Sequence, residues 1–189
     1  ATRELIRGQA LDVAFENRRA VSLDECVEMA RGKTGALMSA SAAIGAALTG
    51  APTVVTDALA AYGDHVGLAF QLVDDLLGIW GRPEITGKPV YSDLRSHKKT
   101  LPVTWAIENG GTAGRELAAW LADELRDPTD AELADVAELV EQGGGRAWAA
   151  EEAGRRAVLA EEAVAHAGAP PEPAGQLRAL ARYLVDREA

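Results

Sequence analysis

Residues 54–80, with the sequence VVTDALAAYGDHVGLAFQLVDDLLGIW, decide the fold class of this 189-residue chain. Apolar side chains occur around the whole circumference of a helix with about 3.6 residues per turn, and the stretch contains no lysine or arginine. A helix that is apolar on nearly every side is buried against other elements in a folded protein. We therefore expect this segment to be a long helix buried inside a helical bundle.

The sequence on both sides of this segment also favours helices. Alanine is abundant, and alternating runs of β-branched residues are missing. Ser22 followed by Glu25 matches the capping box that opens a helix. Because the separators are too short to divide domains, we predict a single all-α domain over residues 1–189. The predicted helices cover residues 1–18, 22–49, 53–81, 101–108, 112–126, 129–142, 146–167 and 174–187, with a turn-rich stretch at 81–100.

Composition and charge exclude several classes of protein. The chain is 48% hydrophobic and 25% charged, which is too apolar for disorder, and its one cysteine, Cys26, excludes a disulfide-rich fold. The formal charge of −10 opposes binding to nucleic acid, which carries the same sign. We interpret no apolar run as a membrane span, and Ala1 to Leu5 lacks the core of a signal peptide. The expected location is therefore the reducing cytoplasm.

The carboxylates and the amide inside the 54–80 segment fall on one side of the predicted helix. At about 100° per residue, a wedge of roughly 100° contains them all. They are Asp57, Asp64, Gln71, Asp74 and Asp75. A stripe of this kind is often the solvated face of an amphipathic helix. This stripe lacks the basic residues that solvated faces commonly contain, so we favour an acidic stripe that points into the bundle.

The adjacent carboxylates of Asp74 and Asp75 indicate a cation site. Two such groups repel one another unless a cation lies between them, and oxygen ligands alone favour Mg²⁺. Mg²⁺ commonly shares its ligands with substrate phosphate, and lysines supply counter-charge for phosphate. Only four of the 19 basic residues are lysines, and all lie in the first hundred residues: Lys33, Lys88, Lys98 and Lys99. Together, these features predict a site for Mg²⁺ and a diphosphate group.

Several short segments resemble, in the same order along the chain, the motifs of trans-type polyprenyl diphosphate synthases. The segment similar to the second aspartate-rich region of that family is FQLVDDLLG at 70–78, and a lysine-containing loop follows it. The other segments are GQALD at 8–12, MARGKTGAL at 29–37, GKPV at 87–90, SDL at 92–94, KKTLP at 98–102 and LARYLVDR at 180–187.

The resemblance implies an isoprenoid-synthase-type helical bundle and a Mg²⁺-dependent prenyltransferase. Such an enzyme ionises an allylic diphosphate and adds the resulting cation to isopentenyl diphosphate, which gives a linear polyprenyl diphosphate. These two diphosphates are the implied substrates. A homodimer is the implied assembly, with the helices at 1–18 and 22–49 at its interface. Because the family sets product length mainly near its first aspartate-rich motif, this sequence does not indicate the product.

The resemblance also implies roles for individual residues. It implies that Asp74 holds Mg²⁺ and that Asp75 supports the ion directly or through water. Phe70 would face the carbocation or the isopentenyl group, where the negative face of its ring is favourable. The residues implied to bind the diphosphate are Lys33, Thr34, Gln71, Lys88 and Lys98.

The chain departs from the family pattern in three ways. The fifth position of the usual Asp-Asp-x-x-Asp motif is Gly78, which removes one carboxylate. Tyr91 and His97 replace two loop glycines, and we expect these replacements to reshape the loop. No second paired-aspartate motif occurs, so the resemblance covers the C-terminal half to three-fifths of a synthase. We therefore expect the chain to be incomplete and inactive alone.

Two alternative functions stay open. A class I terpene cyclase shares the bundle and the acid–Mg²⁺–diphosphate site, although the Lys33-Thr34 segment and the loop from Lys88 to Lys98 favour a synthase. A non-catalytic regulatory subunit that modifies the product length of a longer partner would explain the missing first motif and the glycine at position 78. A product assay distinguishes the cyclase, and co-purification with a longer homologue distinguishes the regulatory subunit.

Overall fold

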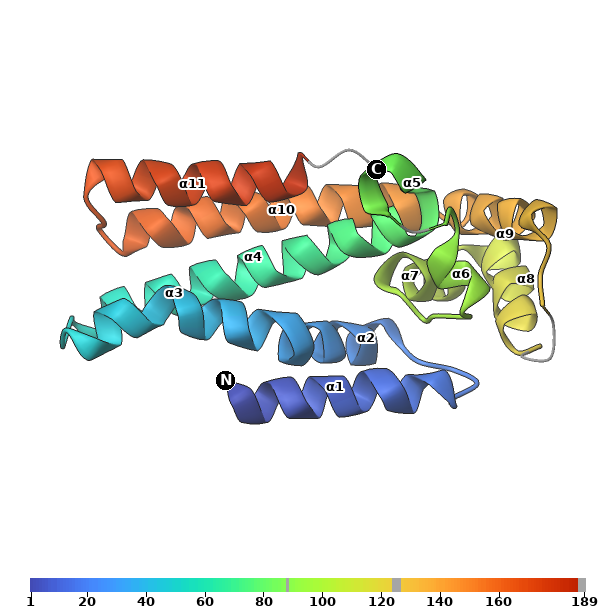
Figure 1. Cartoon of the computed structure of the whole chain (residues 1–189), viewed down its shortest axis with the longest axis horizontal. Coiled ribbons are helices and arrows are strands. Elements are labelled where there is room, and N and C mark those ends of the chain that lie inside the picture. Colours follow the sequence, from blue (N-terminus) through green and yellow to red (C-terminus); the bar gives the residue numbers. More distant parts are fainter. Residues whose placement is uncertain (88, 124–126, 187–189) are drawn as a thin grey trace. The chain divides into compact units, whose positions relative to one another are not determined.

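The computed structural model describes residues 1–87, 89–123 and 127–186, and within these ranges the regular elements are all helices. The predicted all-α fold is therefore confirmed. Figure 1 shows the elements, which are α1 (Thr2–Glu16), α2 (Leu23–Ala30), η1 (Arg31–Gly35), α3 (Ala36–Leu48), α4 (Thr53–Trp80), α5 (Pro83–Thr86), α6 (Ser92–Arg95), α7 (Leu101–Asn109), α8 (Gly111–Leu121), α9 (Asp130–Gln142), α10 (Gly145–His166) and α11 (Pro171–Val185).

The helical run that begins after Ser22 differs in one respect from the continuous helix predicted at 22–49. Its capping box is confirmed, because the Ser22 N–H donates to Glu25 Oε2 (2.9 Å) and the Glu25 N–H donates to Ser22 Oγ (3.2 Å). However, Arg31–Gly35 form a π-helical turn, η1, between α2 and α3. Such turns add a residue to the helical repeat and occur frequently at functional sites.

Two further boundaries differ from the predicted ones for physical reasons. The last helix begins at Pro171 instead of residue 174, because proline in the first helical turn needs no acceptor for an N–H group. The turn-rich stretch at 81–100 contains the short helices α5 and α6. Helix α9 begins where the sequence predicted, and Thr129 forms a capping box with Glu132.

The chain forms two compact units. Unit 1 contains residues 1–10, 28–71 and the described part of 152–187, and unit 2 contains residues 11–27 and the described parts of 72–151. The boundaries between the units fall inside α1, α2, α4 and α10. The prediction of a single domain stays a prediction.

Unit 1 is held together by small side chains between helices. Tyr62 and Val66 of α4 are buried, and the Tyr62 hydroxyl donates to the carbonyl oxygen of Leu177 in α11 (2.9 Å). Figure 1 shows α10 (orange) and α11 (red) side by side in this unit. Alanine allows their backbones to approach closely, which favours dense packing. The buried residues that pack with α4 are Ala160, Ala163, Val164, Ala174 and Ala181.

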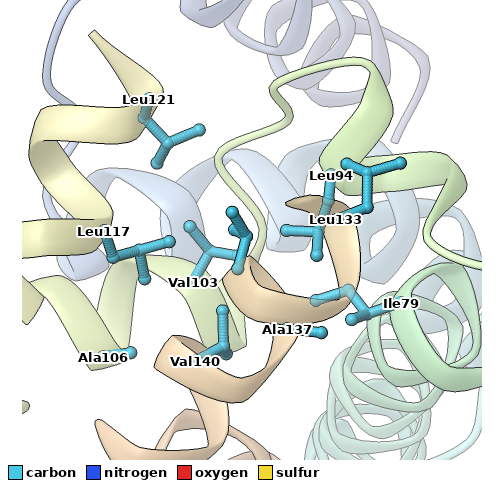
Figure 2. Packing of buried hydrophobic residues seen from close by; sticks show 10 residues of the cluster. Ile79, Leu94, Val103, Ala106, Leu117, Leu121, Leu133, Ala137 and Val140 are labelled. Carbon is cyan, nitrogen blue, oxygen red and sulfur yellow. The ribbon is translucent and has the colours of Figure 1, made fainter. Parts of the chain in front are cut away.

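Unit 2 has a core of branched aliphatic side chains, shown in Figure 2. Ile79, near the end of α4, is fully buried in this cluster, as are Val103 of α7 and Leu133 of α9. The short helix α6 contributes Leu94, which is also fully buried. The loop that follows α4 is therefore anchored to the core and does not lie loosely on the surface.

No helix in the described ranges combines the length and the apolar character that crossing a membrane requires. The 28-residue helix α4 contains four aspartates, at positions 57, 64, 74 and 75. Its apolar surface is largely buried within the protein, because Leu68, Leu72 and Ile79 are each at most 1% exposed.

We predict that Leu133→Ala lowers the free energy of unfolding by about 3 kcal/mol, because removing a fully buried side chain leaves a cavity. Leu48→Ala is the matched control, since Leu48 is 81% exposed and its truncation should change that free energy by less than about 0.5 kcal/mol. Urea unfolding followed by circular dichroism measures both. Equal effects would contradict the placement of Leu133 in the core.

Candidate functional site

The acidic stripe of α4 divides into an exposed part and a buried part. Asp57 is exposed, and Asp64 forms an ion pair with Arg31 (3.6 Å). Asp75 is only 4% exposed, whereas Asp74 is the one half-buried residue in an otherwise buried stretch at 71–79. The end of the stripe is therefore not the solvated face of an amphipathic helix, and Asp74 is the carboxylate that reaches furthest toward solvent.

Asp75 has a structural partner that the sequence did not reveal. Its Oδ2 accepts a hydrogen bond from the backbone N–H of Leu101 (2.9 Å), the first residue of α7. Thr100 precedes α7 but provides no side-chain cap, so the carboxylate of Asp75 satisfies one of the unpaired N–H groups at this helix end. A negative charge is also favourable there because of the helix dipole. Asp75 therefore connects α4 to the start of α7.

Lys98 lies among carboxylates in unit 2. Its Nζ is 3.8 Å from Asp93 Oδ1. Burial lowers the pKa of Lys98, but the negative charges of Asp93, Asp75, Asp12 and Asp74 outweigh this effect and raise the pKa above its ordinary value. The charges of the predicted residues Asp74 and Asp75 thus act on the predicted residue Lys98, and so do those of Asp12 and Asp93. The ammonium group of Lys98 stays protonated at neutral pH.

The neighbouring lysine, Lys99, has a different role. It is buried, and its Nζ donates to the carbonyl oxygen of Glu16 (3.4 Å) at the end of α1, where a positive charge is favourable. The carbonyl oxygen of Lys99 accepts a hydrogen bond from Cys26 Sγ (3.2 Å), and burial raises the pKa of this thiol. Lys99 therefore fixes the loop, while Lys98 is placed among the carboxylates.

In unit 1, the predicted residues Lys33 and Thr34 lie in the π-helical turn η1. The Thr34 hydroxyl donates to Gln71 Oε1 of α4 (3.0 Å), so these two predicted residues are in direct contact. Lys33 and Phe70 are both half-buried. The turn therefore presents a lysine and a hydroxyl beside the face of α4 that bears Gln71.

Two glycine contacts hold this turn in place. A Cβ atom at Gly8 of α1 would lie 2.2 Å from the backbone nitrogen of Lys33. A Cβ atom at Gly67 of α4 would lie 2.7 Å from the Cα of Gly35. Both distances are shorter than a carbon side chain allows, so α1 and α4 approach the turn at backbone contact. Two of these glycines could be noticed in the sequence, because Gly8 lies in the segment GQALD and Gly35 in the segment RGKTG.

The loop positions of Tyr91 and His97 keep a glycine-like backbone. Both residues have positive φ, 61° for Tyr91 and 50° for His97, a region that glycine adopts at little cost. The expectation that these side chains reshape the loop stays a prediction. The His97 ring stacks on Trp120, with ring centroids 4.5 Å apart and an interplanar angle of 7°. This stacking offsets part of the backbone strain.

The oxygen donors of unit 2 fit Mg²⁺. Among the described residues, no three His, Cys, Asp or Glu side chains converge closely enough to hold a metal ion by themselves. In general, Mg²⁺ keeps several waters and takes few ligands from protein side chains. Asp74 is half-buried within an otherwise buried stretch of α4, and its carboxylate offers the hard oxygen donors that Mg²⁺ prefers.

Of the eight predicted site residues, one, Lys88, lies outside the described residues. Because the two units are described separately, a diphosphate shared by Lys33 and Asp74 stays a prediction. No role was predicted from the sequence for Asp12 or Asp93. Both nevertheless lie in segments that resemble the family motifs. The predicted residues of unit 1 are Lys33, Thr34, Phe70 and Gln71, and those of unit 2 are Asp74, Asp75 and Lys98.

Comparison with known proteins identifies similar sequences along the whole chain. The model of the polyprenyl synthetase family matches residues 1–140. The (2E,6E)-farnesyl diphosphate synthase of Mycobacterium tuberculosis is 66% identical over 191 aligned residues, which cover 100% of this chain and 53% of that protein. The chain therefore spans about half the length of this curated relative.

Solved structures show the same fold. A polyprenyl synthetase from Streptomyces coelicolor has a TM-score of 0.92 and 45% identity, covering 96% of this chain and 55% of that one. A geranylgeranyl pyrophosphate synthase from Corynebacterium glutamicum, complexed with isoprenyl diphosphate and magnesium, has a TM-score of 0.87 and 29% identity, covering 98% and 52%. These similarities confirm the predicted isoprenoid-synthase-type bundle.

We predict that Gly8→Ala destabilises the protein by about 2 kcal/mol, because the new methyl group overlaps the backbone of Lys33 in the π-helical turn. Gly45→Ala is the control. Gly45 is exposed on α3, no neighbouring atom lies within 4 Å of the place that a Cβ atom would take, and alanine favours helices, so stability should rise by up to about 1 kcal/mol. Thermal unfolding measures both changes, and a Gly8→Ala protein as stable as the original would contradict the close packing.

Proposed function

Because the chain belongs to the polyprenyl synthetase family, we propose that it acts in a Mg²⁺-dependent prenyltransferase that condenses an allylic diphosphate with isopentenyl diphosphate to a linear polyprenyl diphosphate. The single observation that carries this proposal is the half-buried Asp74, one of the carboxylates whose charge raises the pKa of Lys98, in a chain 66% identical to a farnesyl diphosphate synthase. That relative favours a short product such as farnesyl diphosphate. We also propose a cytoplasmic homodimer.

Asp74 would hold the Mg²⁺ ion, and Asp75 would support it directly or through water. When bound, Mg²⁺ neutralises charge on the diphosphate and so favours its departure as a leaving group. Asp75 already accepts a hydrogen bond from the N–H of Leu101, which fixes the orientation of its carboxylate. A fixed carboxylate beside Asp74 keeps the negative potential that attracts the cation.

The diphosphate itself would be bound by lysines and by neutral donors. Lys98 is protonated at neutral pH, so it can balance phosphate charge without a change in protonation. Lys33 would provide a second ammonium group from the π-helical turn, and Lys88 a third. The hydroxyl of Thr34, which donates to Gln71 in the structure, would have to turn away from that amide to donate to a phosphate oxygen. Each of these residues therefore binds or orients the leaving group.

Phe70 would stabilise the carbocation that remains after the diphosphate leaves. It is half-buried on α4, immediately before Gln71. The face of an aromatic ring is electron-rich, and a cation held over it is stabilised by roughly 1–2 kcal/mol in a site that excludes water. The surrounding apolar surface of α4 would limit the access of water to the cation. Exclusion of water matters because a carbocation captured by water cannot add to isopentenyl diphosphate.

The two alternative functions have unequal support. The comparisons are with polyprenyl and geranylgeranyl synthases, which favours a synthase over a class I terpene cyclase. A non-catalytic regulatory subunit has one specific observation in its favour, the glycine at position 78 in place of an acid. An unchanged rate of a co-purified longer homologue after Asp74→Ala in this chain would support the regulatory subunit.

We predict that Asp74→Asn weakens Mg²⁺-dependent binding of inorganic pyrophosphate by at least about tenfold, because the amide removes the proposed charged ligand of the cation. Asp57→Asn is the matched control: it makes the same chemical change at an exposed position on the same helix, and should leave the affinity unchanged. Isothermal titration calorimetry with and without Mg²⁺ measures the affinity. Equal affinities for the two variants would contradict the proposed ligand.

We also predict that the 189-residue chain alone does not condense prenyl diphosphates, because it contains one paired-aspartate motif where the proposed reaction needs two. The assay incubates the purified chain with Mg²⁺, an allylic diphosphate and radiolabelled isopentenyl diphosphate, and measures extractable product. Detectable turnover would show that this chain is sufficient for catalysis and would refute the expected inactivity.

A further inference from the structure

The two residues that replace loop glycines lie at opposite ends of α6, and both have a backbone conformation that favours glycine. His97 follows α6 with a φ of 50°, and Tyr91 precedes α6 with a φ of 61°. Residues with a side chain seldom adopt positive φ, although histidine does so more often than most. Such a conformation persists only where surrounding contacts hold it, so the contacts of these two side chains deserve an explanation.

Both side chains are anchored on the core of unit 2. The His97 ring stacks in a nearly parallel arrangement on Trp120 of α8, with centroids 4.5 Å apart. Trp120 and Tyr91 in turn pack against the buried cluster that contains Leu133. His97 Nε2 is buried, and among the described residues it has no hydrogen-bond partner. The face of the ring, and not this nitrogen, therefore provides the contact that holds the loop after α6.

This contact restrains the backbone of Lys98, which follows His97 directly. The Lys98 N–H donates to the carbonyl oxygen of Asp93 (2.9 Å). On the other side, Lys99 is buried and donates to the carbonyl oxygen of Glu16 at the end of α1 (3.4 Å). The backbone of Lys98 is thus fixed on both sides, whereas its side chain is 42% exposed and reaches solvent.

A lysine on a fixed backbone binds a diphosphate more tightly than a lysine on a mobile loop, because less conformational freedom is lost on binding. Glycine at position 97, which the family pattern has there, would adopt the same φ without strain. However, glycine has no ring to stack on Trp120 and would leave the loop more mobile. The stack therefore makes the loop more ordered at the cost of a strained residue.

We infer that His97 is a positioning residue for diphosphate binding: its stack on Trp120 fixes the loop, so that Lys98 is ordered before the ligand binds. This inference rests on the proposed function and deepens it, because it adds His97 and Trp120 to the residues on which diphosphate binding depends. Neither residue has to touch the ligand, since each acts through the position of Lys98.

The first test measures the order of the loop without a ligand. Hydrogen exchange of the Lys98 amide, followed by NMR, should become about five- to tenfold faster in His97→Gly and in Trp120→Leu, because either change removes the stack. Amides of the unit 2 core serve as the reference in each variant, so that a general loss of stability is not mistaken for a local one.

Trp148→Leu is the matched control for Trp120→Leu. Trp148 is also a half-buried tryptophan of unit 2 in a parallel stack, in this case on Trp105 of α7 (4.6 Å between centroids, 2° between planes). Its replacement should leave the exchange of the Lys98 amide unchanged relative to the core amides. The same tryptophan-to-leucine change is thus made where it does not contact the loop residue His97.

The second test measures Mg²⁺-dependent binding of inorganic pyrophosphate by calorimetry. His97→Gly should weaken this binding by about five- to tenfold, while its melting temperature stays close to that of wild type, because relief of backbone strain offsets the lost stack. In a Lys98→Met background, the same change should alter the affinity by less than about twofold, because His97 then has no ligand to position. A merely structural role of His97 predicts equal losses in both backgrounds.

Four outcomes overturn the inference and leave the proposed function intact, provided that Asp74→Asn weakens binding: unchanged exchange at Lys98 in His97→Gly, equal acceleration in Trp148→Leu and Trp120→Leu, wild-type affinity of either His97→Gly or Lys98→Met, or equal losses of affinity in the two backgrounds. If wild-type protein shows no Mg²⁺-dependent binding of pyrophosphate, the proposed function fails and takes the inference with it.

Discussion

Buried carboxylates on an apolar helix need compensating partners, and the predicted site residues of unit 2 depend on how α4 provides them. Asp75 is nearly inaccessible to solvent, and burial without a partner would disfavour its charged form. The N–H of Leu101 at the start of α7 donates to it, and Lys98 contributes a positive charge nearby. This compensation connects α4, the loop before α7 and α7 itself. The same interactions therefore connect these helices and balance the charge of the buried carboxylate.

The predicted site residues of unit 1 depend on close backbone packing. The π-helical turn that carries Lys33 is contacted by Gly8 of α1, and Gly67 of α4 contacts its last residue, Gly35. Because no side chains intervene, the position of the turn follows directly from the positions of the two helices. The hydrogen bond between Thr34 and Gln71 adds a polar connection to α4. These glycines therefore matter because they allow the close packing that places the turn, and less because they make the chain flexible.

Much of the fold and part of the site could be predicted from the sequence. The apolar circumference of residues 54–80 predicted a long buried helix, and the Ser22–Glu25 pair predicted where another begins, because both signals arise from interactions within one helix. Residue types and the family resemblance also predicted one site for Asp74, Asp75 and Lys98, which stays a prediction. The π-helical turn was not predicted, since it depends on contacts with α1 and α4 that no local pattern encodes.

What the sequence determined by itself, then, was helical content, the buried segment and the chemical types of the site residues, because periodicity and charge are local properties of a chain. Only the tertiary structure decided which of two neighbouring residues lies near the acidic residues and which one is buried elsewhere. Lys98 lies among carboxylates whereas the adjacent Lys99 is buried against the end of α1. Likewise, the space above Gly78 is filled by Asp93, fifteen positions further along, because α6 folds back onto α4. Such choices depend on which side of each segment meets another segment, and that is set by packing.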